Sequence, residues 1–266
     1  MIFLFVVSML CRNYSILINT SKGYINYRHM SNIQILYEIF KRDGIPEDNI
    51  FTVFQDDPHQ DARNPDKDRI YFMADECIEK CRMKNRMHYR YLTENVILDI
   101  INLKNERLKS LDENDNIVIY MCGHGREGFF KVCDRYFIFK NDLMDILQGV
   151  SKRINNLLLI LDTCQASTLL DERHIPANVT VVTTSLDNEF SYASNAISSL
   201  GVYGIDDFPY FLYKGDLDYN LQADEFFKMF TGNLLSTVKV WGNSTVKMST
   251  FFWSNARSSE IKAFVI

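Results

Sequence analysis

Several short apolar runs along this chain end abruptly at polar side chains. In NLLLILDTCQAS (156–167), the five residues from Leu157 to Leu161 predict a strand that is buried on both faces and leads into an acid, a hydroxyl and a thiol. Comparable runs are YSILINTS (14–21), DNIFTVFQDD (48–57), NIVIYMCGHG (116–125) and NVTVVTTS (178–185). Strands that are apolar throughout are typical of a parallel sheet with both faces covered.

Helical patterns separate these runs. HMSNIQILYEIFKRDG (29–44) has apolar residues at helical spacing and a plausible stop at Gly44. We expect further helices over 92–109, 142–150 and near 220–231, and a late strand near STFFW (249–253). The alternation predicts an α/β fold, with a mostly parallel sheet between helices on both faces.

Two of the predicted strands end at residues that can carry catalysis. Cys164 follows one strand, and His124, between Gly123 and Gly125, follows another. Because sites in parallel sheets form beyond the carboxyl ends of the strands, neighbouring strands would bring both side chains to one edge. The imidazole can accept the thiol proton and later protonate a leaving amine. We expect the N–H groups of Gly125 and Cys164 to stabilise the oxyanion.

The remaining candidates of the same residue types are interpreted as structural. A cysteine at the end of a strand is usually a small core residue, and this is our interpretation of Cys122 and Cys133. His59, His88 and His174 are likewise assigned structural roles.

Composition narrows the classes of function. The chain has 266 residues, is 47% hydrophobic and carries a net charge of -5. This is enough apolar material for one large core, and the interspersed charges offer no basic stripe to a nucleic acid. No CxxC pair is present, so a zinc ribbon or a thioredoxin motif is not expected. We expect no metal and no cofactor.

The first ten residues, MIFLFVVSML, carry no charge and are too few to span a bilayer as a helix. We interpret residues 1–12 as a signal peptide or apolar N-terminal segment and 13–266 as a single catalytic domain. The alternative is that the first ten residues form a buried strand. No later run reaches 18 apolar residues, so no transmembrane helix is predicted.

Three segments, IYMCGHGREGFFK, LLILDTCQAS and GYINYRHMSNI, together resemble the catalytic subunits of GPI transamidases. These enzymes belong to the legumain-like, caspase-fold cysteine peptidases, and the resemblance covers roughly residues 14–210. It implies a caspase-like three-layer sandwich around a six-stranded sheet. It also implies that Cys164 attacks a peptide bond near the C-terminus of a proprotein, and that the ethanolamine amine of a GPI glycolipid resolves the acyl-enzyme.

The resemblance also implies roles for individual residues. Asn26 matches the residue that orients the catalytic imidazole of His124, although it can also be interpreted as a turn asparagine. Arg28 and His29 match residues near the specificity pocket, and Ser191 and Asp206 fall where related enzymes line that pocket. The implied setting is the lumen of the endoplasmic reticulum, within a complex of other transamidase subunits.

Some features depart from the resemblance. The chain ends at IKAFVI without a membrane helix, so membrane attachment is expected through partner subunits. The cysteine that often precedes RNP is absent from HQDARNP, and Arg126 replaces the second glycine after the catalytic histidine. Two alternatives stay open: a legumain-like asparaginyl endopeptidase that uses water, and an inactive scaffold subunit of caspase fold.

Overall fold

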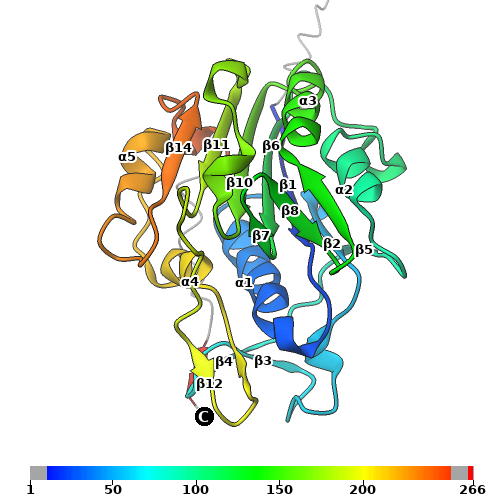
Figure 1. The fold of residues 1–266 in the computed structure, drawn as a ribbon, viewed down its shortest axis with the longest axis vertical. Helices are drawn as coiled ribbons and strands as arrows, with labels where there is room; N and C mark the ends of the chain where they lie inside the picture. Colours follow the sequence, from blue (N-terminus) through cyan, green and yellow to red (C-terminus); the bar gives the residue numbers. More distant parts are fainter. Residues whose placement is uncertain (1–10, 253–262, 266) are drawn as a thin grey trace, which may run out of the picture.

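The computed structural model describes residues 11–252 and 263–265, and its centre is a seven-stranded sheet (Figure 1). The strand order is β14-β11-β10-β6-β1-β2-β5. The ladders between neighbours are parallel, except that β14 pairs with β11 in the antiparallel sense. The bounds are β1 Asn13–Asn19, β2 Ile50–Phe54, β5 Asn85–His88, β6 Asn116–Cys122, β10 Asn156–Asp162, β11 Val179–Thr183 and β14 Lys239–Gly242.

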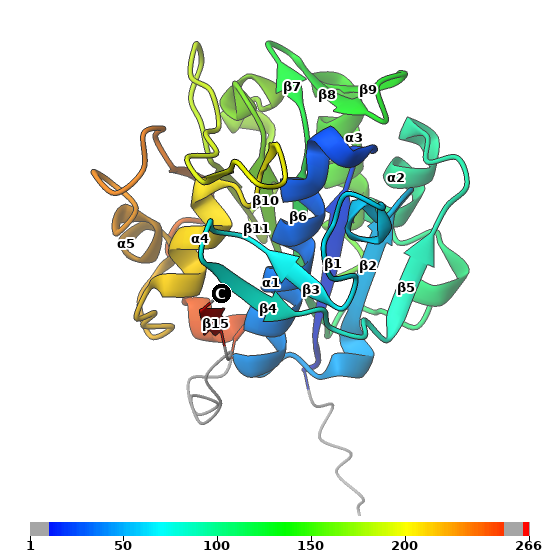
Figure 2. The same ribbon diagram turned by 90° about the horizontal axis from the view of Figure 1, so that it is seen from below.

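Helices cover both faces of this sheet (Figures 1 and 2). One face carries α1 Tyr27–Arg42, α4 Asp207–Lys214 and α5 Ala223–Lys228, and the other carries α2 Glu94–Ile101 and α3 Lys140–Val150. Short 3-10 helices are Tyr24–Asn26, Glu47–Asn49, Pro58–Gln60, Glu106–Leu108, Ala166–Leu169, Glu172–His174 and Met248–Thr250. Three small sheets complete the described structure. The first contains β3 Arg69–Tyr71, β4 Glu76–Glu79 and β15 Ala263–Val265, and the second contains β7 Gly125–Arg126, β8 Phe129–Val132 and β9 Tyr136–Phe139. The third contains β12 Ala196–Ile197 and β13 Val202–Tyr203.

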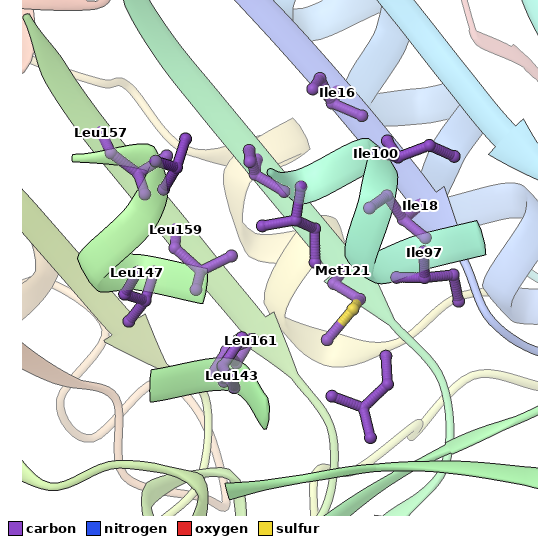
Figure 3. Packing of buried hydrophobic residues seen from close by; sticks show 14 of the residues in the cluster. Ile16, Ile18, Ile97, Ile100, Met121, Leu143, Leu147, Leu157, Leu159 and Leu161 are labelled. Atoms are coloured by element: carbon purple, nitrogen blue, oxygen red, sulfur yellow. The ribbon is translucent and has the colours of Figure 1, made fainter. Parts of the chain in front are cut away.

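The strands are apolar throughout because each one contributes to two cores. In β1, Ile16 and Ile18 pack in the cluster that includes Ile97 of α2 and Leu147 of α3 (Figure 3). Leu17, between them, points to the opposite cluster, which contains the buried side of α1. Alternate side chains of a strand point to opposite faces, so burial of both faces requires a continuous apolar run.

The predicted α/β class and the mostly parallel sheet between two helical layers are confirmed. The sheet has seven strands, one more than the six expected. The two edge strands, β5 (NRMH) and β14 (KVWG), were not predicted, because edge strands are short and carry polar residues.

Two local predictions were wrong. The strand expected near 249–253 is instead a 3-10 helix over Met248–Thr250, followed by the buried side chains of Phe251 and Phe252. The helix expected over 92–109 ends at Ile101, because Leu103 has a positive φ of 55° that an α-helix does not accept.

Residues 1–10, most of the segment 1–12 that is predicted as a signal peptide or apolar N-terminal segment, lie outside the described residues. The structure begins with Cys11 and Arg12, just before β1. Arg12 donates from Nε and Nη2 to the two carboxylate oxygens of the buried Asp115, at 2.8 Å each. Within the described part of the chain, none of the helices has the length and apolarity needed to cross a bilayer.

Candidate active site

Cys164 and His124 follow neighbouring strands in the same register. In the parallel ladder of β10 and β6, Asp162 lies opposite Cys122. His124 lies two positions after Cys122, and Cys164 lies two positions after Asp162. The N–H of Gly123 donates to the carbonyl of Asp162 at 3.3 Å, which ties the two strand ends together. The sheet therefore delivers the thiol and the imidazole to one edge, because parallel strands end at the same side.

Gly125 allows the two loops to approach each other closely. A Cβ atom at this position would lie 2.5 Å from Oγ1 of Thr163 and 3.1 Å from the carbonyl oxygen of Phe129. Thr163 directly precedes Cys164. A glycine is needed here for the close packing of the histidine loop against the cysteine loop.

Asn26 reaches His124 from the other side. Its Oδ1 lies 2.8 Å from Nε2 of His124, and its Nδ2 donates to the carbonyl of Lys22 at 2.7 Å. The Lys22 contact fixes the amide orientation, so Oδ1 faces the ring as an acceptor. Nε2 of a neutral His124 then carries the proton, and Nδ1 keeps the lone pair that can accept one.

Burial keeps both candidate catalytic groups neutral before substrate binds. Burial lowers the pKa of His124 below its ordinary 6.5, and the positive charges of Arg28 and Lys131 lower it further. Burial raises the pKa of the Cys164 thiol above 9.0, while a hydrogen bond from the backbone of Ser191 opposes the rise. At neutral pH the pair is thus thiol and imidazole, and a proton transfer must create the thiolate.

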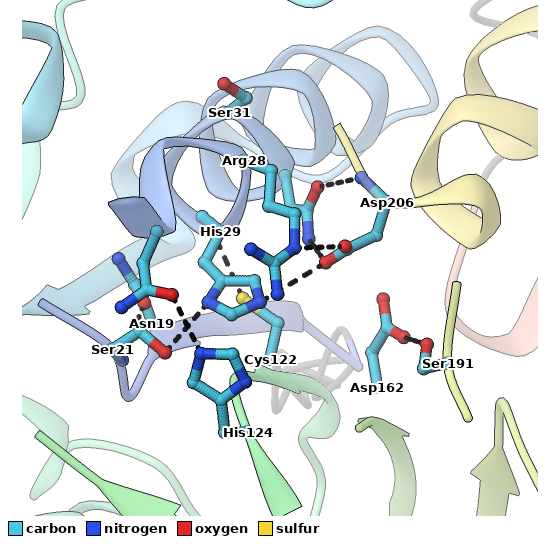
Figure 4. Close-up of polar contacts among 12 residues, drawn as sticks. Asn19, Ser21, Arg28, His29, Ser31, Cys122, His124, Asp162, Ser191 and Asp206 are labelled. Carbon is cyan, nitrogen blue, oxygen red and sulfur yellow. Dashed lines mark hydrogen bonds and ion pairs between the residues drawn. The ribbon is translucent and has the colours of Figure 1, made fainter. Parts of the chain in front are cut away.

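His29 packs against the candidate base. The rings of His29 and His124 meet edge to face with centroids 5.1 Å apart, and His29 lies between His124 and Asp206 in Figure 4. Nδ1 of His29 is 2.8 Å from the hydroxyl of Ser21. Burial lowers the pKa of His29 well below 6.5, so its ring is neutral at neutral pH.

Arg28 and Asp206 form a partly buried ion pair at the start of α1 and of α4. Nε of Arg28 donates to Oδ1 of Asp206 at 2.8 Å. Asn32, one helical turn further along α1, donates to Oδ2 at 2.6 Å and accepts the backbone N–H of Asp206 at 3.1 Å. Burial raises the pKa of Asp206, and Arg28 opposes the rise.

The structure adds Asp162, which the sequence analysis did not select as a site residue. Its carboxylate accepts hydrogen bonds from the hydroxyls of Tyr120 at 2.6 Å, Thr184 at 2.8 Å and Ser191 at 2.8 Å (Figure 4 draws the bond to Ser191). Burial raises its pKa, and these donors oppose the rise. The sequence feature that could have identified Asp162 is its position as an acidic residue at the end of an apolar strand. Its partners come from β6, the end of β11 and a later loop, which no local pattern connects.

A pocket of about 400 Å³ opens beside the imidazole. It is lined by Ile25, Asn26, Arg28, His124, Lys131, Asp134 and Tyr203. Of the predicted residues, Asn26, Arg28 and His124 line this pocket, whereas Cys164, Gly125, Ser191 and Asp206 are not among its lining residues. Ser191 is bonded to Asp162, and Asp206 is bonded to Arg28.

A parallel sheet whose adjacent strand ends present a thiol and an oriented imidazole is the arrangement of a cysteine peptidase or of a related acyl transferase. Residues 13–203 match the model of the Peptidase C13 family. The chain belongs to this family.

Curated relatives carry a more particular name. The chain is 33% identical to "GPI-anchor transamidase" of Saccharomyces cerevisiae, over 85% of this chain and 58% of that protein. It is 33% identical to "Putative GPI-anchor transamidase" of Drosophila melanogaster, over 75% of this chain and 59% of that protein. For "GPI-anchor transamidase" of Schizosaccharomyces pombe the identity is 32%, over 74% of this chain and 54% of that protein. The chain therefore spans little more than half the length of these relatives.

Among solved structures, the chain is similar to caspase-1 of Spodoptera frugiperda. The TM-score is 0.42 and the identity is 11%, over 74% of this chain and 68% of that one.

Proposed function

We propose that this chain is the catalytic subunit of a GPI transamidase. It would cleave a C-terminal attachment signal through a cysteine acyl-enzyme and transfer the protein to the amine of a GPI glycolipid. The observation that carries the proposal is the hydrogen bond from Nε2 of His124 to Oδ1 of Asn26, at the strand end beside Cys164. Relatives named GPI-anchor transamidases support the choice within the family.

In the first half-reaction, Cys164 attacks the scissile carbonyl. Nε2 of His124 is held by Asn26, so Nδ1 takes the thiol proton as the carbon–sulfur bond forms. The N–H groups of Gly125 and Cys164 stabilise the oxyanion; one such donor is typically worth about a hundredfold to a thousandfold in rate. The imidazolium then protonates the leaving amine, and the C-terminal signal departs from the thioester.

In the second half-reaction, an amine replaces water as the nucleophile. The uncharged amine of the glycolipid attacks the thioester carbon and loses one proton to His124 as the carbon–nitrogen bond forms. The carbon–sulfur bond breaks, and the thiolate recovers that proton from His124. The lowered pKa of His124 suits this step, because the ring must be neutral to act as a base.

Arg28, Ser191 and Asp206 bind the substrate residue before the scissile bond. Three contacts support this assignment. Ser191 donates its hydroxyl to Asp162, two residues before Cys164, and its backbone hydrogen-bonds toward the Cys164 thiol. Arg28 lines the pocket beside His124 while it holds Asp206. The charges of Arg28 and Asp206 offset each other, so the subsite suits a small uncharged side chain, as attachment sites require.

The proposed setting is the lumen of the endoplasmic reticulum, in a complex with the other transamidase subunits. Any cleavage of a signal within residues 1–12 is expected before Arg12. Loss of this residue would remove the cation that pairs with the buried Asp115.

The test is expression in cells that lack their own transamidase catalytic subunit, scored for GPI-anchored proteins at the surface. Rescue by the wild-type chain and none by Cys164→Ala at equal protein levels is expected. Release of the proprotein without anchoring would assign the chain to water-using endopeptidases. Equal rescue by both forms would remove Cys164 as the nucleophile, and no rescue by either form is the outcome expected of an inactive scaffold subunit.

A further inference from the structure

The pocket beside His124 carries an ion pair that the proposed chemistry has not used. Lys131 and Asp134 both line it, with Nζ of Lys131 2.7 Å from Oδ1 of Asp134. We propose that this pair is the acceptor subsite, where Asp134 binds the ammonium and Lys131 the phosphodiester of the incoming ethanolamine-phosphate headgroup. This inference rests on the proposed transamidase function. It adds the site at which the amine nucleophile binds before it attacks the thioester.

The position of the pair is fixed relative to the base. The N–H of Lys131 donates to the carbonyl of His124 at 2.8 Å, so β8 runs directly beside the catalytic loop. The turn after β8 places Cys133 and Asp134 at positive φ values of 48° and 62°. The N–H of Cys133 donates to the carbonyl of Thr20 at 2.7 Å, which holds this turn against the end of β1. Asp134 is thereby held at the pocket rather than on a free loop.

The pair remains open to a ligand. The side chains of Lys131 and Asp134 are 33% and 49% exposed, so both remain accessible to solvent and to a ligand while they are paired. An ammonium ion has three donors and a phosphate has several acceptor oxygens. A zwitterion can therefore lie across the pair, with each of its charges against the opposite side chain.

The charge balance of the pocket matches such a headgroup. The hydrogen bond from Lys131, followed by the charges of His124 and Lys22, lowers the pKa of Asp134, so it is a carboxylate at neutral pH. The charge of Lys22, which is not among the lining residues, also acts on Asp134, and the carbonyl of Lys22 accepts the amide of Asn26. One fixed anion among several cations suits a ligand that joins one ammonium to one phosphate.

Asp134 and His124 then share the delivery of the nucleophile. The ammonium first lies against Asp134, loses one proton to bulk water and becomes the free amine. This amine attacks the thioester of Cys164 and passes its second proton to His124. The carbon–nitrogen bond forms, the carbon–sulfur bond breaks, and the thiol is restored by the proton from His124.

The experiment uses microsomes from cells in which this chain replaces the endogenous catalytic subunit. A translated proprotein is incubated with glycerophosphoethanolamine, ethanolamine or hydroxylamine, and the new C-terminus is identified by mass spectrometry. Hydroxylamine is uncharged at neutral pH and carries no phosphate, so it reports thioester formation alone. The lipid on the membrane-bound product distinguishes the glycolipid from phosphatidylethanolamine.

We expect Lys131→Met to raise the KM for glycerophosphoethanolamine about 5- to 20-fold, the effect of one partly exposed charged contact, and to leave ethanolamine use nearly unchanged. Asp134→Asn should impair both ammonium acceptors. At a pH well above 6.5, where His124 is neutral in every variant, neither substitution should change release by hydroxylamine. Lys131→Arg should retain most of the phosphodiester preference. Lys104→Met and Asp99→Asn, in an exposed ion pair of 3.9 Å outside the pocket lining, are the matched controls.

The possible failures are distinguishable. If the wild-type chain forms no amine product with any acceptor, the proposed function fails and the inference fails with it. If amine products form but Lys131→Met treats glycerophosphoethanolamine as the wild type does, only the acceptor subsite is wrong. Equal slowing of hydroxylamine release would assign the pair to the peptide substrate and also overturn the inference.

Discussion

Oδ1 of Asn26 lies 2.8 Å from Nε2 of His124, although 98 positions separate the two residues in the chain. Asn26 ends the 3-10 helix before α1, and His124 follows β6, so the contact depends on the packing of α1 against the sheet. The contact selects the ring tautomer and leaves Nδ1 free to accept a proton. This relationship gives the first prediction.

Asn26→Ala should lower kcat and kcat/KM together by about 10- to 100-fold, because an orienting partner acts mainly in the transition state. Active-site titration with a thiol-reactive probe, paired with a melting curve, is the measurement. Asn26→Asp keeps an acceptor at the same place and should retain more activity. Unchanged turnover per titrated site would reduce the site to His124 and Cys164.

Cys164→Ala and His124→Ala should each abolish turnover and leave the fold intact. Both residues lie in loops beyond the strand ends, outside the two large apolar clusters. The melting temperature should therefore stay close to that of the wild type. Cys81→Ala is a suitable control, because Cys81 contacts Gln34 away from the pocket lining. Near-normal anchoring by Cys164→Ala at matched protein levels would remove the nucleophile assignment.

The acid limb of kcat/KM should lie below pH 6.5. Catalysis needs a neutral imidazole, and burial, Arg28 and Lys131 together lower the pKa of His124, while Asp134 raises it slightly. Lys131→Met removes one cation and should move the limb upward toward 6.5. The measurement is a pH profile with a peptide substrate and hydroxylamine as the acceptor. A limb that does not move, or that moves to lower pH, would contradict this electrostatic account.

Gly125→Ala should impair activity by at least about tenfold, because the added Cβ would meet Oγ1 of Thr163 at 2.5 Å and disturb both catalytic loops. Thr163→Ala removes the nearest obstructing atoms, so the double variant should recover part of the loss. A double-mutant cycle on kcat/KM and on melting temperature measures this coupling. Additive effects of the two substitutions would show that the steric contact is not the cause.

His59 should make the fold less stable in acid. It is fully buried, its Nε2 lies 3.1 Å from the hydroxyl of Ser31, and burial lowers its pKa from 6.5 to about 3. Between these values the unfolded chain binds a proton that the folded chain does not, so stability is lost as pH falls below 6.5. Relative to His59→Gln, the wild type should lose up to about 1.4 kcal/mol per pH unit there. Parallel urea titrations from pH 7 to 5 measure the difference, and equal slopes would contradict it.

Local patterns predicted the elements that have strong periodicity. The apolar runs became β1, β2, β6, β10 and β11, and the helical pattern over 29–44 became α1. Such elements are predictable because burial of both faces of a strand, or of one side of a helix, leaves a regular signature in neighbouring residues. The same logic placed Cys164 and His124 beyond two strand ends, since parallel strands direct their carboxyl ends to one edge.

The tertiary structure alone decided the contacts around these residues. Asp162 accepts hydrogen bonds from the hydroxyls of Tyr120, Thr184 and Ser191. The pocket beside His124 is lined by residues as far apart in the chain as Ile25 and Tyr203. The edge strands β5 and β14 are defined by their pairing with β2 and β11, and not by a pattern in their own residues. The physical reason is the same in each case. A hydrogen-bond partner or a lining side chain is chosen by distance in space, and residues far apart in the chain carry no mutual periodicity. The sequence determined which strands are buried and that Cys164 and His124 follow the ends of two of them. The packing of the fold determined which groups surround this thiol and imidazole and shift their pKa values.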